Sequence, residues 1–120
     1  MIYTVTLNPA LDYIMYPENL AAGEINRSSR ESLYFGGKGI NVSFILNELE
    51  IPSVATGFIA GFTGDALENA VSAFAKPDFV RLENGITRIN VKLRAENETD
   101  INAAGPEVSK ADINRLFERL

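Results

Sequence analysis

The sequence contains neither cysteine nor histidine among its 120 residues. Without cysteine, the chain can form neither a disulfide nor a thiolate metal site. Without histidine, it lacks the side chain that most often carries a proton near neutral pH. Any general base in the chain must therefore be a carboxylate or a lysine.

The sequence is also poor in positive charge and in long apolar runs. Its formal net charge of -5 argues against a nucleic-acid or anionic-membrane surface. No apolar run approaches the length of a membrane span, and no secretory signal follows Met1. We therefore expect a cytoplasmic protein that binds neither nucleic acid nor membrane. Its length and its 46 % apolar content fit one domain, or part of one.

Short runs of apolar and β-branched residues predict strands at 2–7 and 54–61, with a further strand at 79–82. The Asn8-Pro9 pair ends the first of these runs. Mixed stretches at 13–16 and 25–34 predict small exposed strands. Between 88 and 94, apolar and polar residues alternate, which predicts a half-buried strand with one strongly basic face.

Three helices are predicted from apolar residues spaced three and four apart. Pro52 closes the first helix, Asp65 is the expected N-cap of the second, and Ser109 with Asp112 caps the third. The apolar stripes are Val42, Ile45, Leu46 and Leu49; Leu67, Ala70, Val71 and Phe74; and Ile113, Leu116, Phe117 and Leu120.

Strands and helices that alternate through short connections predict an α/β fold with a parallel sheet and helices on both faces. Three or four strands make such a sheet thin, and the last helical stripe runs to the end of the chain. The sequence therefore resembles the first part of a larger α/β domain.

A glycine-rich loop, FGGKGINVS at 35–43, precedes the first helix. A Walker loop needs Ser or Thr after its lysine, but Gly39 follows Lys38. A dinucleotide fingerprint needs a small residue where Val42 stands. Neither nucleotide-binding motif therefore fits. Two interpretations remain: the glycines give a ligand access to the backbone and the helix N-terminus faces an anion or hydroxyls, or the loop is only a tight turn.

Four motifs together resemble the ribokinase-like sugar kinases, also called the PfkB family. They are TLNPALD (6–12), GGKGINVS (36–43), TRINVKL (87–93) and ETDINAAGP (98–106), in the order expected for that family. The resemblance is closest to the branch that acts on fructose 1-phosphate, with kinases of tagatose 6-phosphate as near neighbours. It covers only the N-terminal portion of a family whose members are more than twice as long.

The resemblance implies a ribokinase-like three-layer α/β/α domain, of which residues 1–120 are an N-terminal fragment. It also implies a small β-sheet lid formed by segments 12–17, 24–35 and 87–102. Such a lid covers the sugar and commonly pairs two subunits, so a homodimer through the lid sheet is expected. Lid closure excludes water and favours transfer to sugar over hydrolysis of ATP.

The resemblance assigns the sugar hydroxyls to a carboxylate and to the glycine loop. Asp12 accepts hydrogen bonds from hydroxyls, Gly36 and Gly37 bring the backbone close to the sugar, and Asn41 binds a further hydroxyl. The alternatives are a solvated turn aspartate for Asp12 and a local hydrogen bond at the helix start for Asn41.

The phosphate of the sugar needs basic ligands, and the resemblance offers Lys38, Arg27 and Arg88, with Asn90 beside Arg88. Arg88 is the preferred ligand because a guanidinium fork matches phosphate oxygens. Lys92 and Arg94 are left out, as the exposed basic face of an ordinary strand.

The implied parent reaction converts fructose 1-phosphate and ATP into fructose 1,6-bisphosphate and ADP, with ATP and Mg²⁺ as cofactors of the full-length enzyme. The family's catalytic base and anion hole come from a GAGD-type motif, which this sequence does not contain. We therefore expect no catalytic, nucleotide-binding or metal-binding residue in the chain, and no activity from it alone.

Three alternatives stay open at this point. The substrate could instead be tagatose 6-phosphate or fructose 6-phosphate. The chain could be a non-catalytic module that binds sugar phosphates, or a doubly wound nucleotide-binding domain, although the failed fingerprints weaken the last.

Overall fold

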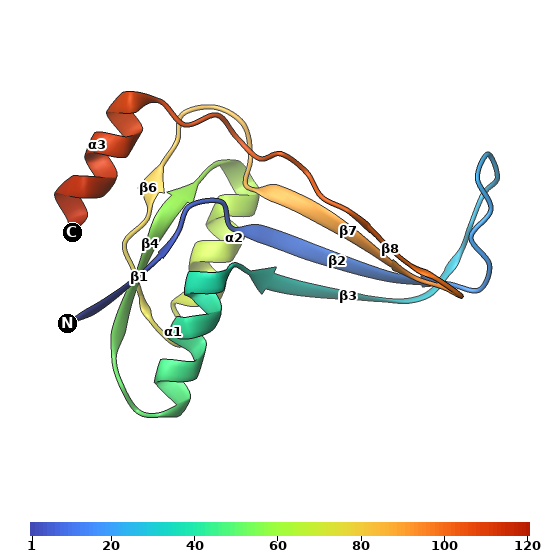
Figure 1. Ribbon diagram of the computed structural model, residues 1–120, viewed down its shortest axis with the longest axis horizontal. Helices are drawn as coiled ribbons and strands as arrows, with labels where there is room; N and C mark the ends of the chain where they lie inside the picture. The colour runs from blue at the N-terminus through green and yellow to red at the C-terminus, as the bar shows by residue number, and fades with distance from the viewer.

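The chain folds into two four-stranded sheets that share no strand, as the computed structural model of residues 1–120 shows (Figure 1). We call them the core sheet and the outer sheet. The core sheet contains β1 (Ile2–Thr6), β4 (Ser53–Ile59), β5 (Lys76–Pro77) and β6 (Val80–Arg81). The outer sheet has the order β3 (Ser28–Gly36), β2 (Ala10–Pro17), β7 (Arg88–Arg94) and β8 (Glu98–Ile101). It projects from the core sheet as an arm.

The core sheet is parallel and is covered by helices on both faces. β4 lies at its centre, with β1 on one side and the short strands β5 and β6 on the other. Helices α1 (Lys38–Glu48) and α2 (Gly61–Val71) cover one face, and α3 (Lys110–Arg119) covers part of the other. The predicted three-layer α/β architecture is therefore confirmed.

Strand β4 confirms the predicted strand at 54–61, and all seven of its residues are buried. Because side chains alternate along a strand, Ala55 and Ile59 enter the cluster under α1 and α2, whereas Phe58 enters the cluster under α3. The predicted strand at 79–82 is shorter than expected and is preceded by β5, which the sequence did not predict.

The apolar stripe predicted for the first helix does not face the core. Val42, Ile45 and Leu49 are between 50 % and 64 % exposed, while Ile40 and Ser43 are the buried residues of α1. The Ser43 hydroxyl is hydrogen-bonded to the hydroxyls of Thr4 at 2.7 Å and Ser53 at 2.9 Å. The helix is therefore oriented by these buried hydroxyl pairs, which hydropathy does not detect.

The predicted N-cap of the second helix is also wrong. Helix α2 begins at Gly61 with Ala60 as its N-cap, so Asp65 lies within the helix. Its carboxylate pairs with Arg81 at 2.6 Å. The apolar part of the prediction holds, because Leu67 and Val71 are fully buried.

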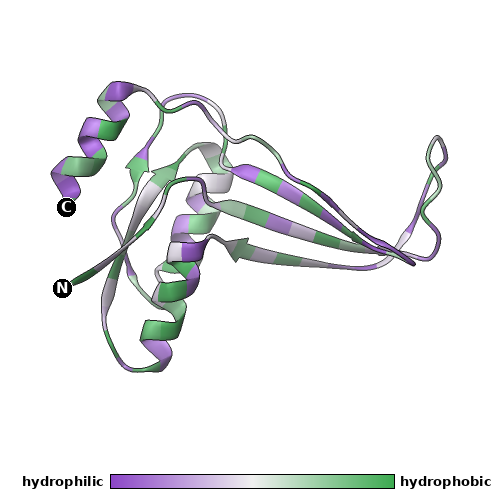
Figure 2. Cartoon of the chain, viewed as in Figure 1, coloured by the Kyte–Doolittle hydropathy of each residue, from purple (hydrophilic) through white to green (hydrophobic).

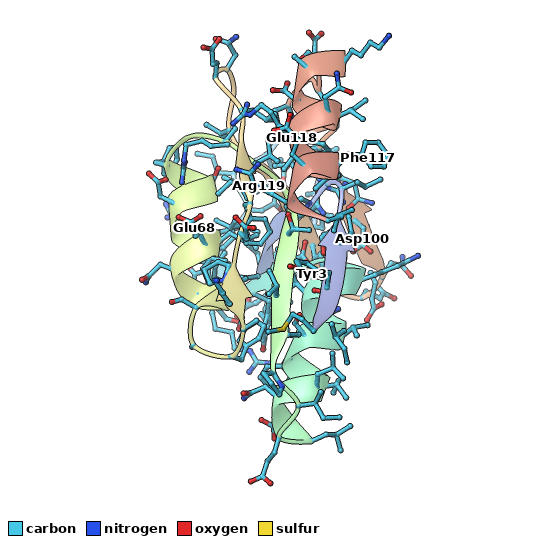
Figure 3. All side chains as sticks on the ribbon, turned by 90° about the vertical axis from the view of Figure 1, so that its left-hand side faces the viewer. Tyr3, Glu68, Asp100, Phe117, Glu118 and Arg119 are labelled. Atoms are coloured by element: carbon cyan, nitrogen blue, oxygen red, sulfur yellow. The ribbon has the colours of Figure 1, made fainter.

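Helix α3 starts as predicted. Ser109 and Asp112 form a reciprocal capping box, in which the Ser109 hydroxyl accepts from the Asp112 amide at 3.1 Å. Hydrogen bonds from the Ser109 backbone amide and then its hydroxyl lower the pKa of Asp112. Of the predicted stripe only Leu116 is buried, and Phe117 is 68 % exposed. Figure 3 shows Phe117 on the same side of the molecule as Tyr3 of β1.

In the outer sheet, β2 is longer than the strand predicted at 13–16, β3 lies close to the predicted stretch 25–34, and β7 has the predicted bounds 88–94, whereas β8 was not predicted. Apolar and polar residues alternate along β7 as predicted. Figure 2 shows this alternation along β7. Most of β7 is half-buried, as predicted, but at its start the apolar residue is the exposed one: Ile89 is 37 % exposed and Asn90 only 7 % exposed. Asn90 is covered because its side chain is hydrogen-bonded both to Asp12 of β2 and to the segment after β8.

Candidate functional site

The candidate site lies at the base of the outer sheet, where β2 and β7 leave the core. In the register of the sheet, Asp12 lies between Asn90 of β7 and Tyr34 of β3. Partners in register project from the same face, so the three side chains share the polar face. Strand pairing thus joins residues that are 78 positions apart in the sequence.

The Asp12 carboxylate lies between the Asn90 side chain and the backbone of Gly36. The Asn90 amide donates from Nδ2 to Oδ1 of Asp12 at 3.2 Å. On the other side of the carboxylate, a Cβ atom added to Gly36 would lie 3.2 Å from Oδ2 of Asp12. Glycine at position 36 therefore leaves this oxygen uncovered, which suits a carboxylate that accepts hydrogen bonds from a ligand.

Residues 103–105, a loop segment that follows β8, lie next to Asn90 and Asn8 at the site. The Ala103 amide donates to Oδ1 of Asn90 at 3.0 Å, and Nδ2 of Asn8 donates to the Ala104 carbonyl at 3.0 Å. Gly105 has a φ of +89°, a conformation that favours glycine, and a Cβ there would collide with the Asn8 side chain. We call residues 103–105 the strap.

Arg88 stands next to Asp12 on the polar face and is held by the same strap. Its Nε donates to the Asn8 carbonyl at 3.2 Å and its Nη1 donates to the Ala103 carbonyl at 3.3 Å. Because a guanidinium carries five N–H donors, these bonds fix its orientation and leave Nη2 for a ligand. An arginine fixed in this way can present donors to a phosphate without first losing side-chain entropy.

The glycine loop places three further predicted residues at the start of α1. Gly37 is the N-cap with a φ of +150°, where a Cβ would collide with Thr6. Lys38 and Asn41 lie in the first turn, and both are exposed. The first turn of a helix offers free amide donors and a partial positive charge, which suits anions and hydroxyls.

Arg27 is the one predicted site residue that the structure places elsewhere. Pro17 pairs with Ser28, so Arg27 lies beyond the far end of β2. Pro17 is five positions beyond Asp12 along the strand, a distance of about 17 Å at roughly 3.4 Å per residue. Within one chain, Arg27 and Asp12 therefore do not face one small ligand.

The remaining basic residues of β7 are paired with acids of β8. Lys92 contacts Asp100 at 3.4 Å, and Arg94 contacts Asp100 at 3.0 Å and Glu98 at 3.7 Å. The Arg94 hydrogen bond lowers the pKa of Asp100, and the same bond raises the pKa of Arg94. These pairs neutralise the outer part of the basic face, whereas Arg88 has no carboxylate partner.

Other features of the chain lie apart from this site. No cluster of three or more acidic residues is placed to hold a metal ion. A cavity of about 660 Å³ lies between residues 82–85 and 106–115, and Asp12 is not among the residues that line it. No helix is long and apolar enough to cross a membrane.

Sequence reasoning missed Asn8 and the strap as parts of this site. Asn8 lies in the motif TLNPALD and ends a predicted strand, and residues 102–106 belong to the motif ETDINAAGP, but neither motif by itself indicates a role at the site. A signal was present, since Gly105-Pro106 marks a tight turn close to the basic strand. The residues that the strap contacts, however, depend on strand pairing across the outer sheet, which cannot be predicted from the local sequence.

The fold and this site define an α/β domain of the ribokinase-like kinase type. The profile of the pfkB family carbohydrate kinases matches residues 5–118. Since this match spans nearly the whole chain, the chain belongs to that family.

Two relatives that cover nearly the whole chain are named as sugar-phosphate kinases. The chain is 46 % identical over 125 residues to the 1-phosphofructokinase of Bacillus subtilis, covering 99 % of this chain and 39 % of the relative. It is 37 % identical over 121 residues to the D-tagatose-1-phosphate kinase of Bacillus licheniformis, covering 100 % of this chain and 40 % of the relative.

Among solved structures, the chain superposes on a candidate phosphofructokinase from Staphylococcus aureus with a TM-score of 0.93 and 38 % identity. The match covers 99 % of this chain and 39 % of that structure. The chain therefore spans about two fifths of the length of the relatives it matches.

Proposed function

We propose that this chain is the sugar-phosphate-binding part of an ATP-dependent sugar-phosphate kinase. The parent reaction would convert fructose 1-phosphate and ATP into fructose 1,6-bisphosphate and ADP. The observation that carries the proposal is the placement of the Asp12 carboxylate: Asn90 is hydrogen-bonded to one of its oxygens, Gly36 leaves space beside the other, and an oriented arginine, Arg88, lies on the same face of the sheet.

Each part of this site suits one part of a sugar phosphate. Oδ2 of Asp12 would accept from sugar hydroxyls, and Gly36 and Gly37 would let the ring approach the backbone. Asn41 would bind a further hydroxyl. Arg88 and Lys38 would bind the phosphate, the first through its free Nη2 and the second beside the α1 N-terminus.

Calorimetric titration of the chain with fructose 1-phosphate tests this proposal. We expect saturable binding that Asp12→Ala weakens at least tenfold, about 1.4 kcal/mol, because several hydroxyls lose their acceptor. Asp65→Asn is the matched control, since Asp65 is an exposed carboxylate on α2 that pairs only with Arg81. Equal affinity in the Asp12 variant and the control would contradict the assignment.

A second substrate is favoured by the Bacillus licheniformis relative, whose name specifies D-tagatose 1-phosphate. Fructose and tagatose 1-phosphates differ only in the configuration of one hydroxyl, so the same acceptor could serve both. Parallel titrations with tagatose 1-phosphate, tagatose 6-phosphate and fructose 6-phosphate rank these substrates. Tighter binding of either 6-phosphate would reassign the position of the phosphate.

The chain alone would not transfer phosphate. The GAGD-type motif expected to supply the base and the nucleotide-side anion hole is absent from its sequence. ATP and Mg²⁺ would bind to the full-length kinase and supply the phosphoryl group there. We expect no turnover of fructose 1-phosphate by the purified chain, and measured turnover would overturn this part of the proposal.

The outer sheet would act as the lid over the sugar and as a homodimer contact. Its apolar face carries exposed side chains that include Leu33 at 48 % and Ile101 at 59 %. A second copy could cover this face, because two such sheets would bury it mutually. Sedimentation should show a dimer that Leu33→Lys converts to a monomer. A wild-type monomer at high concentration would contradict the dimer.

A cytoplasmic location is proposed with this function.

A further inference from the structure

The Asn90 side chain bridges Asp12 and the strap, and both of its ends are used. Nδ2 donates to Asp12, and Oδ1 accepts from the Ala103 amide. With only 7 % of its surface exposed, Asn90 presents little of itself to a ligand. Its position indicates that Asn90 orients Asp12 and does not itself bind the sugar.

The two partners of Asn90 permit only one orientation of its amide. A backbone N–H can only donate, so it requires Oδ1 on its side. An ionised carboxylate can only accept, so it requires Nδ2 on the other side. A flipped amide would place two donors together and two acceptors together, and would lose both hydrogen bonds.

Asp12 is in turn held with its two oxygens in different environments. Oδ1 receives the Asn90 hydrogen bond, and Oδ2 lies where only the absence of a side chain at Gly36 keeps space free. The carboxylate is thereby oriented before a ligand arrives. Such preorganisation strengthens binding, because the rotamer freedom has already been lost.

The strap that orients Asn90 is itself fixed at both ends of the site. Asn8, just after β1, holds Ala104, and Arg88, at the start of β7, holds Ala103. Gly105 allows the strap to lie this close to Asn8. The strap therefore connects the core sheet, the outer sheet and the hydrogen bond behind Asp12.

We propose that Asn90 is a positioning residue, held by the Ala103 amide of the strap, that turns Oδ2 of Asp12 toward the ligand. The inference rests on the proposed function in so far as the ligand is a sugar phosphate. It adds that Asn8, which does not touch Asp12, controls the affinity of the site through the strap.

Two substitutions at position 90 separate the two hydrogen bonds. Asn90→Asp keeps an acceptor for the Ala103 amide but loses the donor to Asp12 and places a second carboxylate beside it. Asn90→Ala removes both bonds. We measure hydrogen exchange of the Ala103 amide by NMR, the χ1 coupling constants of Asp12 without ligand, and calorimetric affinity for fructose 1-phosphate.

In Asn90→Asp we expect the Ala103 amide to stay protected, while Asp12 averages between rotamers and affinity falls at least tenfold. In Asn90→Ala we expect faster exchange at Ala103 as well. Asn8→Ala should speed exchange in the strap and weaken binding severalfold. Asn47→Ala on α1, whose side chain takes part in no hydrogen bond, is the matched control and should change none of these.

The outcomes distinguish this inference from the proposed function. A single Asp12 rotamer that persists in both Asn90 variants overturns the positioning role, even when affinity falls, since direct contact of Asn90 with the sugar would then explain the loss. Failure of the wild-type chain to bind any sugar phosphate overturns the proposed function. The ligand-free NMR measurements still decide the role of Asn90, and dispersed spectra show that each variant is folded.

Discussion

The two sheets of this protein differ in how they are stabilised. In the core sheet, every residue of β4 is buried, and helices pack on both of its faces. In the outer sheet, all four residues of β8 are exposed, and the strands depend on pairing and on surface ion pairs. The difference indicates that the core sheet determines whether the chain folds, while the outer sheet and its base determine what it binds.

The candidate site stands at the boundary between these regions. Asp12 and Asn90 belong to the outer sheet, but the strap ties them to Asn8 after β1. A site so placed gains rigidity from the core sheet while keeping an open polar face. Substitutions in the two regions should therefore separate folding from binding.

The largest effect is expected in the core. Leu67→Ala removes a fully buried side chain beneath α2 and should lower the free energy of unfolding by about 2–5 kcal/mol. Urea denaturation followed by circular dichroism measures this. Tyr34→Ala in the outer sheet is the comparison, because Tyr34 lies on the polar face, away from the proposed dimer contact, and its 58 % exposure limits the expected loss to about 1 kcal/mol. Equal losses would show that the two sheets are not stabilised differently.

The next effect separates binding from folding at the boundary. In Gly36→Ala, the added Cβ lies 3.2 Å from Oδ2 of Asp12, so the methyl group crowds the oxygen proposed to accept the sugar. We expect at least a tenfold loss of affinity for fructose 1-phosphate by calorimetry, and little change in the urea midpoint.

Gly23→Ala is the comparison for this variant, because Gly23 has open space around it but a φ of +79°. It should leave affinity unchanged and cost some stability through backbone strain. If Gly36→Ala binds as well as wild type, Oδ2 of Asp12 is not the sugar-facing atom.

The same contrast between regions explains what could be predicted from the sequence. β4 was predictable because burial on both faces makes its sequence mostly apolar and free of charged residues. The orientation of α1 was not, because hydroxyls of Thr4, Ser43 and Ser53 take the place of the expected apolar contacts. The N-cap predicted at Asp65 was wrong because the same pattern, an aspartate three residues before a glutamate, also occurs within helices. Here Asp65 lies inside α2 and pairs with Arg81.

At the site, Asp12 and Gly36 were predicted by resemblance, and the structure places them so close together that a side chain at position 36 would crowd the Asp12 carboxylate. The hydrogen bonds that hold these residues in place were not predictable. The bond from Ala103 to Asn90 depends on how a loop folds back across the base of β7, which no local periodicity records. Pairing of Asp100 with Lys92 and Arg94 likewise depends on the register of β8.

A smaller effect is expected at α3, which covers only part of its face of the core sheet. Ser109→Ala removes the hydroxyl of the capping box and should cost about 1 kcal/mol of unfolding free energy. Thermal denaturation measures it. Ser72→Ala, a hydroxyl after α2 that bonds only to a local carbonyl, is the comparison and should have less effect. A larger loss in Ser72→Ala would mean that the cap does not hold α3 in place.

The smallest effect at neutral pH is expected from the ion pairs of the outer sheet. The Arg94 hydrogen bond lowers the pKa of Asp100 in the folded chain, so folded Asp100 binds a proton less readily than unfolded Asp100. Its stabilisation is therefore fully present above the ordinary carboxyl pKa of about 4 and is lost as the pH falls through the lowered value. Asp100→Asn should change the urea midpoint slightly at pH 7 and flatten its decline in acid, whereas Glu96→Gln, which has no ion pair, should leave that decline unchanged. If the stability of Asp100→Asn falls as steeply in acid as that of wild type, the outer sheet is not the source of the pH dependence. The capping box of Ser109 and Asp112 would then be the source, because the pKa of Asp112 is also lowered.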